Sequence, residues 1–179
     1  MKQLFTSIIL CYTLLSACNG PSKKETISGE ELQKTVLKTF SDSLKADTFT
    51  LQIQGDKPRD MRLLFTIRSW QGQEIYRTTI SATSLFKNYN ATIDLSKKNN
   101  QIKFLKEEMD EFFEEENFME PAVTEGEHPD QYVPDKPFFE ELKQNQLNGF
   151  MYRLGKDDKR YIAWSASERK VKTYYSCCQ

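Results

Sequence analysis

The chain has 179 residues, with 25 Lys and Arg against 26 Asp and Glu, and a single His. This length suits one domain, and the balanced charge excludes a globally basic surface of the kind that binds nucleic acid. One His excludes most zinc sites and most His-based acid–base catalysis, whereas 12 Phe and 8 Tyr provide apolar surface for a core.

The first 17 residues have the features of an export signal. A lysine at position 2 precedes a short apolar stretch from Leu4 to Leu15, which is followed by the small residues Ser16 and Ala17. The stretch is too short to span a bilayer stably, and no later apolar run approaches the length of a membrane span.

The segment Leu15-Ser16-Ala17-Cys18 resembles the lipobox of bacterial lipoproteins. The resemblance implies that residues 1–17 are a removed signal peptide and that Cys18 carries the lipid, whose acyl chains would hold the chain on a membrane. Asn19 after the cysteine implies the outer membrane, and the lack of an acidic cluster behind it favours the periplasmic face over the cell surface. The alternative is an ordinary secreted protein in which Cys18 is a thiol.

Polar and helix-breaking residues predict a lipidated tether over 18–30, followed by a single α+β domain over 31–179. The domain is expected to open with a helix over about 31–46. Ser28 and Glu31 have capping-box spacing, and four apolar residues recur at every fourth position, namely Leu32, Val36, Phe40 and Leu44.

Three strands are expected next. Apolar and polar residues alternate over 49–53 and over 61–67, and residues 75–82 are rich in Ile and Thr. A break at 55–58 and a tight turn at Gln71-Gly72 would join these segments into an antiparallel meander.

Two helices and a second meander complete the predicted domain. Apolar residues at three- and four-residue steps predict a helix over 98–116. After a loop over 117–134, a second helix is expected to begin with Asp135 as its N-cap and Pro137 in its first turn, and to end at Asn148-Gly149. Strands are expected over 150–154, 160–166 and 171–177.

These elements predict an α+β fold: an antiparallel sheet of about six strands in two three-stranded meanders, with the helices packed on one face. The layout is similar to that of small cystatin-like folds, a likeness of fold that carries no function.

Charge is distributed unevenly, because residues 105–147 hold 14 acidic and three basic residues. Clustered carboxylates suit a docking surface for a basic envelope protein, a site for a divalent cation, or a solvated helix face. The calcium-loop pattern is absent, so no metal is assigned. We name the candidate partner-binding residues the acidic band: Glu107, Glu108, Asp110, Glu111, Glu114, Glu115, Glu116 and Glu120.

Other reactive residues give weaker signals. His128 lies in an acidic loop and is either a pH-sensitive group or an ordinary surface residue. A disulfide between the adjacent Cys177 and Cys178 would be strained, so their oxidation state stays open. Hydrolase, zincin and phosphate-loop motifs are absent, so we expect no enzyme, no catalytic residue and no cofactor.

Aromatic residues are frequent in the C-terminal meander and alternate with Arg and Lys. Such a sheet face can hold a glycan or an anionic lipid, although strand alternation would place half of the rings in the core. The residues are Phe150, Tyr152, Tyr161, Trp164, Tyr174 and Tyr175.

The expected protein is therefore an outer-membrane-anchored periplasmic lipoprotein with a non-catalytic binding domain, resembling small bacterial envelope lipoproteins. One alternative is an envelope inhibitor or immunity-type protein that uses its acidic surface over 107–120 against a basic toxin or hydrolase. The other is a glycan- or lipid-binding module. No nucleic-acid partner is expected, and the sequence leaves the ligand and the oligomeric state open.

Overall fold

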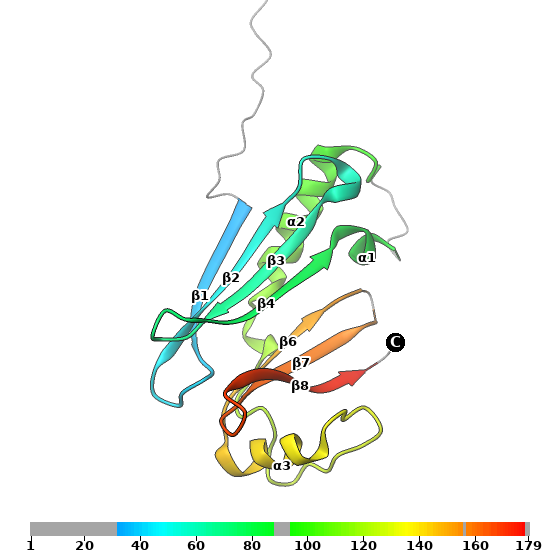
Figure 1. Cartoon of the computed structure of the whole chain (residues 1–179). Helices are drawn as coiled ribbons and strands as arrows, with labels where there is room; N and C mark the ends of the chain where they lie inside the picture. Colours follow the sequence, from blue (N-terminus) through cyan, green and yellow to red (C-terminus); the bar gives the residue numbers. More distant parts are fainter. Residues whose placement is uncertain (1–31, 88–93, 156, 178–179) are drawn as a thin grey trace, which may run out of the picture.

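Two four-stranded antiparallel sheets form the framework of the computed structural model (Figure 1). The structure describes residues 32–87, 94–155 and 157–177. Sheet A has the strand order β1-β2-β3-β4, with β1 (Gln33–Thr39), β2 (Ala46–Gln54), β3 (Arg62–Arg68) and β4 (Glu74–Ser81). Sheet B has the order β5-β6-β7-β8, with β5 (Phe118–Met119), β6 (Gly149–Arg153), β7 (Lys159–Ser165) and β8 (Lys170–Cys177).

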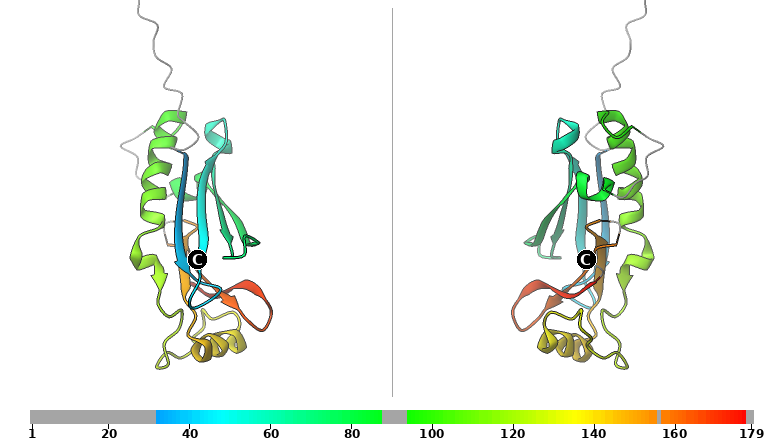
Figure 2. Two further views of the ribbon diagram at one scale, coloured as in Figure 1. Left: turned by 90° about the vertical axis from the view of Figure 1, so that its left-hand side faces the viewer. Right: turned by 90° about the vertical axis from the view of Figure 1, so that its right-hand side faces the viewer.

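Helices connect and cover the two sheets. In the described part of the chain they are α1 (Ala82–Phe86), α2 (Lys98–Phe112) and α3 (Lys136–Asn145), with short 3₁₀ turns η2 (Pro58–Asp60) and η3 (Glu115–Asn117). Helix α2 runs along sheet A, whereas α3 lies beside sheet B at the opposite end of the molecule (Figure 2).

The predicted fold, one sheet of about six strands in two three-stranded meanders, is wrong, because the described residues form eight strands in two separate sheets. The six predicted strand segments overlap β2, β3, β4, β6, β7 and β8. Each meander has one further strand at its edge, β1 in sheet A and the two-residue β5 in sheet B. The helices also cover two different sheets and not one common face.

The helix predicted over 31–46 is also wrong, because residues 33–39 form β1, which pairs along its whole length with β2. Apolar residues four positions apart share one face of a helix, but they share one face of a strand as well. The segment contains several β-branched residues, and pairing places Val36 opposite Phe49. Leu44, assigned to the helix face, is 89% exposed in the loop that follows.

Aromatic rings join the two sheets into one core. Phe65 of sheet A contacts Phe112 of α2, with ring centroids 5.1 Å apart, and Tyr152 of β6 at 5.6 Å. Phe49 meets Phe150 of β6 at 5.3 Å, again edge to face. All five rings are buried, so helix α2 and strand β6 pack against the same face of sheet A.

Helix α2 begins at Lys98 as predicted but ends at Phe112, four residues before the predicted end. The side-chain amide of Asn117 donates to the carbonyl oxygens of Glu111 and Phe112, at 2.9 and 3.2 Å. These bonds satisfy carbonyls at the helix end, so the chain turns there into η3 and β5.

Helix α3 begins as predicted. Asp135 is its N-cap and accepts from the Phe138 N–H at 3.1 Å, and Pro137 lies in the first turn. The predicted end at Asn148-Gly149 is wrong, because the helix ends at Asn145 and Gln146 takes the left-handed conformation, with φ of 52°. Gly149 instead belongs to β6, where a Cβ atom would lie 2.8 Å from the Tyr174 hydroxyl.

Several predicted features lie outside the described residues: the signal peptide over 1–17, the tether over 18–30 with Cys18, and Cys178. Cys177 is half-buried at the end of β8. Over the ranges that are described, no helix is both long and apolar enough to cross a membrane.

Candidate functional site

The acidic band follows α2, η3 and the residue after β5. Seven of its carboxylates belong to exposed or half-exposed positions, whereas Glu108 is buried, with a residue exposure of 8%. The band therefore does lie mainly on the surface, but its members do not all face outward.

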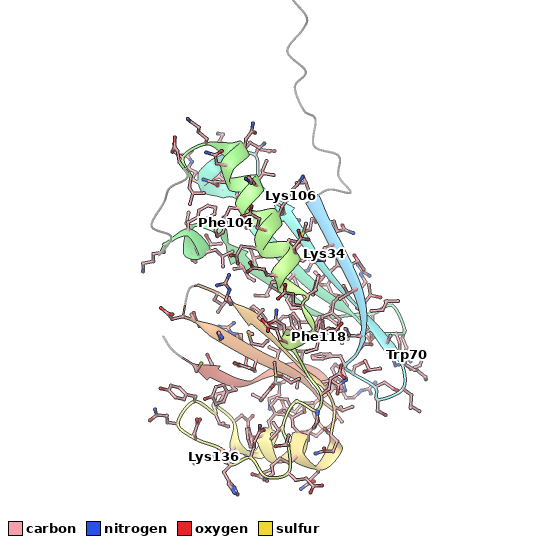
Figure 3. All side chains as sticks on the ribbon, turned by 180° about the vertical axis from the view of Figure 1, so that it is seen from behind. Lys34, Trp70, Phe104, Lys106, Phe118 and Lys136 are labelled. Carbon is pink, nitrogen blue, oxygen red and sulfur yellow. The ribbon has the colours of Figure 1, made fainter. Side chains whose placement is uncertain are left out.

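Basic side chains from β1 and β6 neutralise half of this band. Arg153 donates to both carboxylate oxygens of Glu108, at 2.6 and 2.7 Å, and lies 3.8 Å from Glu111. Lys34 lies 3.1 Å from Asp110, and Figure 3 shows this lysine on β1 beside α2. A further pair joins Lys38 to Glu115 at 2.5 Å.

Two of the paired carboxylates, Glu108 and Glu111, line a cavity of ≈ 210 Å³ that also touches sheet A, sheet B and η3. Burial raises the pKa of Glu108, and the hydrogen bond and charge of Arg153 oppose this effect without cancelling it. Within the described residues, no group of three or more His, Cys, Asp or Glu side chains is arranged to hold a metal ion. We therefore interpret this cavity as part of the packing between α2 and the two sheets.

The aromatic residues of the second meander are divided among three places. Phe150 and Tyr152 belong to the core, as alternation predicts. Trp164 borders a polar cleft shared with sheet A. The three tyrosines, Tyr161, Tyr174 and Tyr175, border a different pocket on the side of sheet B that α3 covers, and the exposed His128 borders that pocket too.

Both tryptophans of the chain border the same cleft, although the sequence places them far apart. Trp70 is 45% exposed in the turn between β3 and β4, at the end of sheet A (Figure 3), and Trp164 is half-buried on β7. We name this ≈ 360 Å³ space the tryptophan cleft; it is lined by Ser41, Ser69, Trp70, Gln71, Gln73, Glu74, Ile75, Trp164, Arg169 and Lys170.

A buried carboxylate holds the sheet A side of the tryptophan cleft. Asp47 is fully buried at the start of β2 and accepts from the Ser41 N–H at 2.6 Å, the Ser41 hydroxyl at 3.0 Å and the Trp70 N–H at 2.8 Å. The turn closes with a Gly72 N–H to Ser69 carbonyl bond of 2.7 Å, and Gly72 has φ of 83°. The predicted turn at Gln71-Gly72 is thus confirmed. Asp47 also holds this turn against the loop between β1 and β2, because it accepts from Trp70 in the turn and from Ser41 in that loop.

A second carboxylate holds the sheet B side. Glu141 of α3 accepts hydrogen bonds from Ser165 at the end of β7 and from Ala166 and Ser167 in the turn that leads to β8. Partial burial raises the pKa of Glu141, but the hydrogen bonds from Ser167, Ser165 and Ala166 outweigh it and keep the pKa below its ordinary value. This turn carries Arg169 and Lys170 into the cleft wall.

The polar and charged groups around the cleft differ in whether they already have a partner. The Ser69 hydroxyl is buried and has no hydrogen-bond partner in the described structure, which is a costly arrangement for a buried polar group. Glu74 is occupied by Arg77, with contacts of 2.6 and 2.8 Å. Lys45 covers the Trp70 ring, with its nitrogen 3.4 Å from the ring centroid.

The cleft was missed by the sequence analysis because no spacing links Trp70 to Trp164. The available signal was compositional: the chain has only two tryptophans, and each stands beside a polar turn segment. No protein-family model, curated protein or solved structure matches the chain.

Proposed function

We propose that the protein is a lipoprotein anchored through Cys18 in the outer membrane, facing the periplasm, and that its domain binds a saccharide in the tryptophan cleft without catalysis. The observation that carries the binding proposal is the meeting of both tryptophans in one cleft with polar side chains. The anchor rests on the lipobox resemblance of residues 15–18.

The composition of the cleft suits a sugar. An indole ring offers a flat apolar face to the C–H groups of a pyranose ring, and its N–H remains available to a hydroxyl. The serine and glutamine side chains that line the cleft supply donors and acceptors for sugar hydroxyls. A volume of ≈ 360 Å³ falls within the range of small-molecule sites, roughly 300–1,000 Å³.

Charge favours an acidic saccharide over a neutral one. Arg169 and Lys170 line the cleft, and Lys45 lies over Trp70. Lys170 has a partner in Glu168 at 2.5 Å, and the carboxylate of Glu74 is taken by Arg77. A ligand carboxylate would therefore meet a surplus of positive charge, and the guanidinium of Arg169 could bind it with two hydrogen bonds.

An inhibitor or immunity-type role has less support. Four residues of the acidic band, Glu108, Asp110, Glu111 and Glu115, already face basic side chains of the same chain. A basic partner would have to compete with these contacts or bind through the remaining carboxylates alone.

Calorimetric titration with an oligogalacturonate and with an uncharged chito-oligosaccharide tests the saccharide proposal. We expect the acidic sugar to bind more tightly, and Trp70→Ala and Trp164→Ala each to weaken it at least about tenfold, or 1.4 kcal/mol. Tyr132→Ala, which truncates an exposed ring outside the cleft, is the matched control and should bind normally. Failure of both sugars to bind at about 1 mM, or equal losses in the control, would contradict the proposal.

A further inference from the structure

A β-bulge gathers three tyrosines at one end of sheet B. Tyr161 pairs with Tyr175, but the next residue on β7, Ile162, pairs with Thr173, so Tyr174 is the extra residue on β8. Neighbouring residues of a regular strand point to opposite faces, and a bulge removes that alternation. The ring of Tyr161 therefore lies close to both neighbours, 6.0 Å from Tyr174 and 5.3 Å from Tyr175.

These rings border a pocket of ≈ 290 Å³, here named the tyrosine pocket. Phe139 of α3 and Met119 of β5 add apolar walls, and Glu127 reaches the pocket from the loop between β5 and α3. The pocket is separate from the tryptophan cleft and shares no lining residue with it.

Tyr174 borders this pocket with a polar group that the protein does not use. The residue is only 4% exposed, and its hydroxyl makes no hydrogen bond within the described structure. Gly149 makes room for it, since a Cβ there would lie 2.8 Å from the hydroxyl oxygen. This close fit fixes the Tyr174 ring in the wall of the pocket.

The charge around the tyrosine pocket is negative. The Glu127 carboxylate accepts only a backbone N–H, that of Thr124 at 3.1 Å, and Asp130 accepts from the Tyr175 hydroxyl at 3.2 Å. Lys143 is close, but its nitrogen donates to the Glu127 carbonyl at 2.9 Å and lies 3.9 Å from Glu140. Burial raises the pKa of Tyr174, and Tyr161 and Glu127 raise it further, so its phenol stays neutral.

We propose that the tyrosine pocket binds an organic ammonium group, such as the trimethylammonium head of choline. The electron-rich faces of aromatic rings attract such cations, and a nearby carboxylate supplies the opposite charge. A purely apolar ligand would fill the same volume but would desolvate Glu127 without compensation. The ring arrangement and the carboxylate together therefore favour a cation with an apolar surface.

Titration with choline and with its uncharged isostere 3,3-dimethylbutan-1-ol, followed by calorimetry, tests this proposal. Choline should bind at least tenfold more tightly than the isostere. Glu127→Gln and Tyr161→Leu should each weaken choline binding about tenfold while the circular dichroism spectrum stays unchanged. Glu125→Gln, in the same loop but outside the pocket lining, is the matched control and should leave the affinity as it was. Equal binding of choline and the isostere, no binding of choline, or equal losses for Glu125→Gln and Glu127→Gln would overturn the proposal.

The ammonium group has two sources in an envelope, a free solute or a lipid headgroup. Co-sedimentation of the Cys18→Ser chain with phosphatidylcholine vesicles, compared with phosphatidylglycerol vesicles, separates them. Binding to phosphatidylcholine that Glu127→Gln abolishes would identify a headgroup site. Binding of free choline without binding to these vesicles would identify a site for a soluble amine, and both results support the ammonium assignment.

Discussion

Replacing Asp47 with Ala should destabilise the domain and displace one wall of the tryptophan cleft. The buried carboxylate accepts three hydrogen bonds, and its loss leaves the backbone N–H groups of Ser41 and Trp70 without a partner. An unpaired buried donor costs about 1–3 kcal/mol. Both N–H groups lie in loops near solvent, where water can form part of the missing hydrogen bonds. We therefore expect the free energy of unfolding to fall by about 2–4 kcal/mol.

Urea unfolding followed by tryptophan fluorescence measures this loss. Asp42→Ala is the matched control, because its carboxylate accepts from the Leu44 and Lys45 N–H groups, at 2.8 and 3.2 Å, in an exposed loop. We expect that variant to lose less than about 1 kcal/mol. Folded Asp47→Ala should also bind the acidic saccharide at least about tenfold more weakly. Equal stability losses in the two variants would refute the inference that burial makes the Asp47 contacts important.

Two further measurable outcomes rest on contacts in the structure, and a third rests on the lipobox resemblance. Gly149→Ala should lower the free energy of unfolding in urea by about 1–3 kcal/mol, because the new methyl group would crowd the Tyr174 hydroxyl. Adding Tyr174→Phe should restore part of that free energy. A double variant as unstable as Gly149→Ala would contradict the contact between Gly149 and Tyr174. The pKa of Glu141 is lowered in the folded protein, so its carboxylate stabilises the fold above pH 4.5, its ordinary pKa, and this stabilisation is lost as the pH falls through the lower folded pKa. Glu141→Gln should therefore lose less unfolding free energy on acidification than the wild type. An equal loss in the two proteins would contradict this. Cys18→Ala should abolish fractionation with the outer membrane, and a correctly cleaved variant that still fractionates there would argue against the anchor.

Local pattern was sufficient for six strands and for the start of both long helices. Alternation of apolar and polar residues fixed the regions of β2 and β3, and the Asp135 cap with Pro137 located the start of α3. These features depend on neighbours in sequence, which is why a single sequence reveals them.

What the sequence analysis missed depends on contacts between distant segments. The four-residue spacing around Val36 suits a helix or a strand, and only pairing with β2 selects the strand. The lysines opposite the acidic band could not be recognised while β1 was assigned to a helix. The meeting of Trp70 with Trp164 depends on how sheet A lies against sheet B, and the grouping of Tyr174 with Tyr161 depends on a one-residue bulge.

Fluorine NMR of 5-fluorotryptophan-labelled protein tests the central claim, that one ligand contacts both tryptophans. The chain has two tryptophans, so the spectrum should contain two resonances that Trp70→Phe and Trp164→Phe assign. On titration with an oligogalacturonate, we expect both resonances to shift with the same dissociation constant, since both rings border one cleft. A shift of only one resonance, shifts with different dissociation constants, or no shift at saturating sugar would contradict the account.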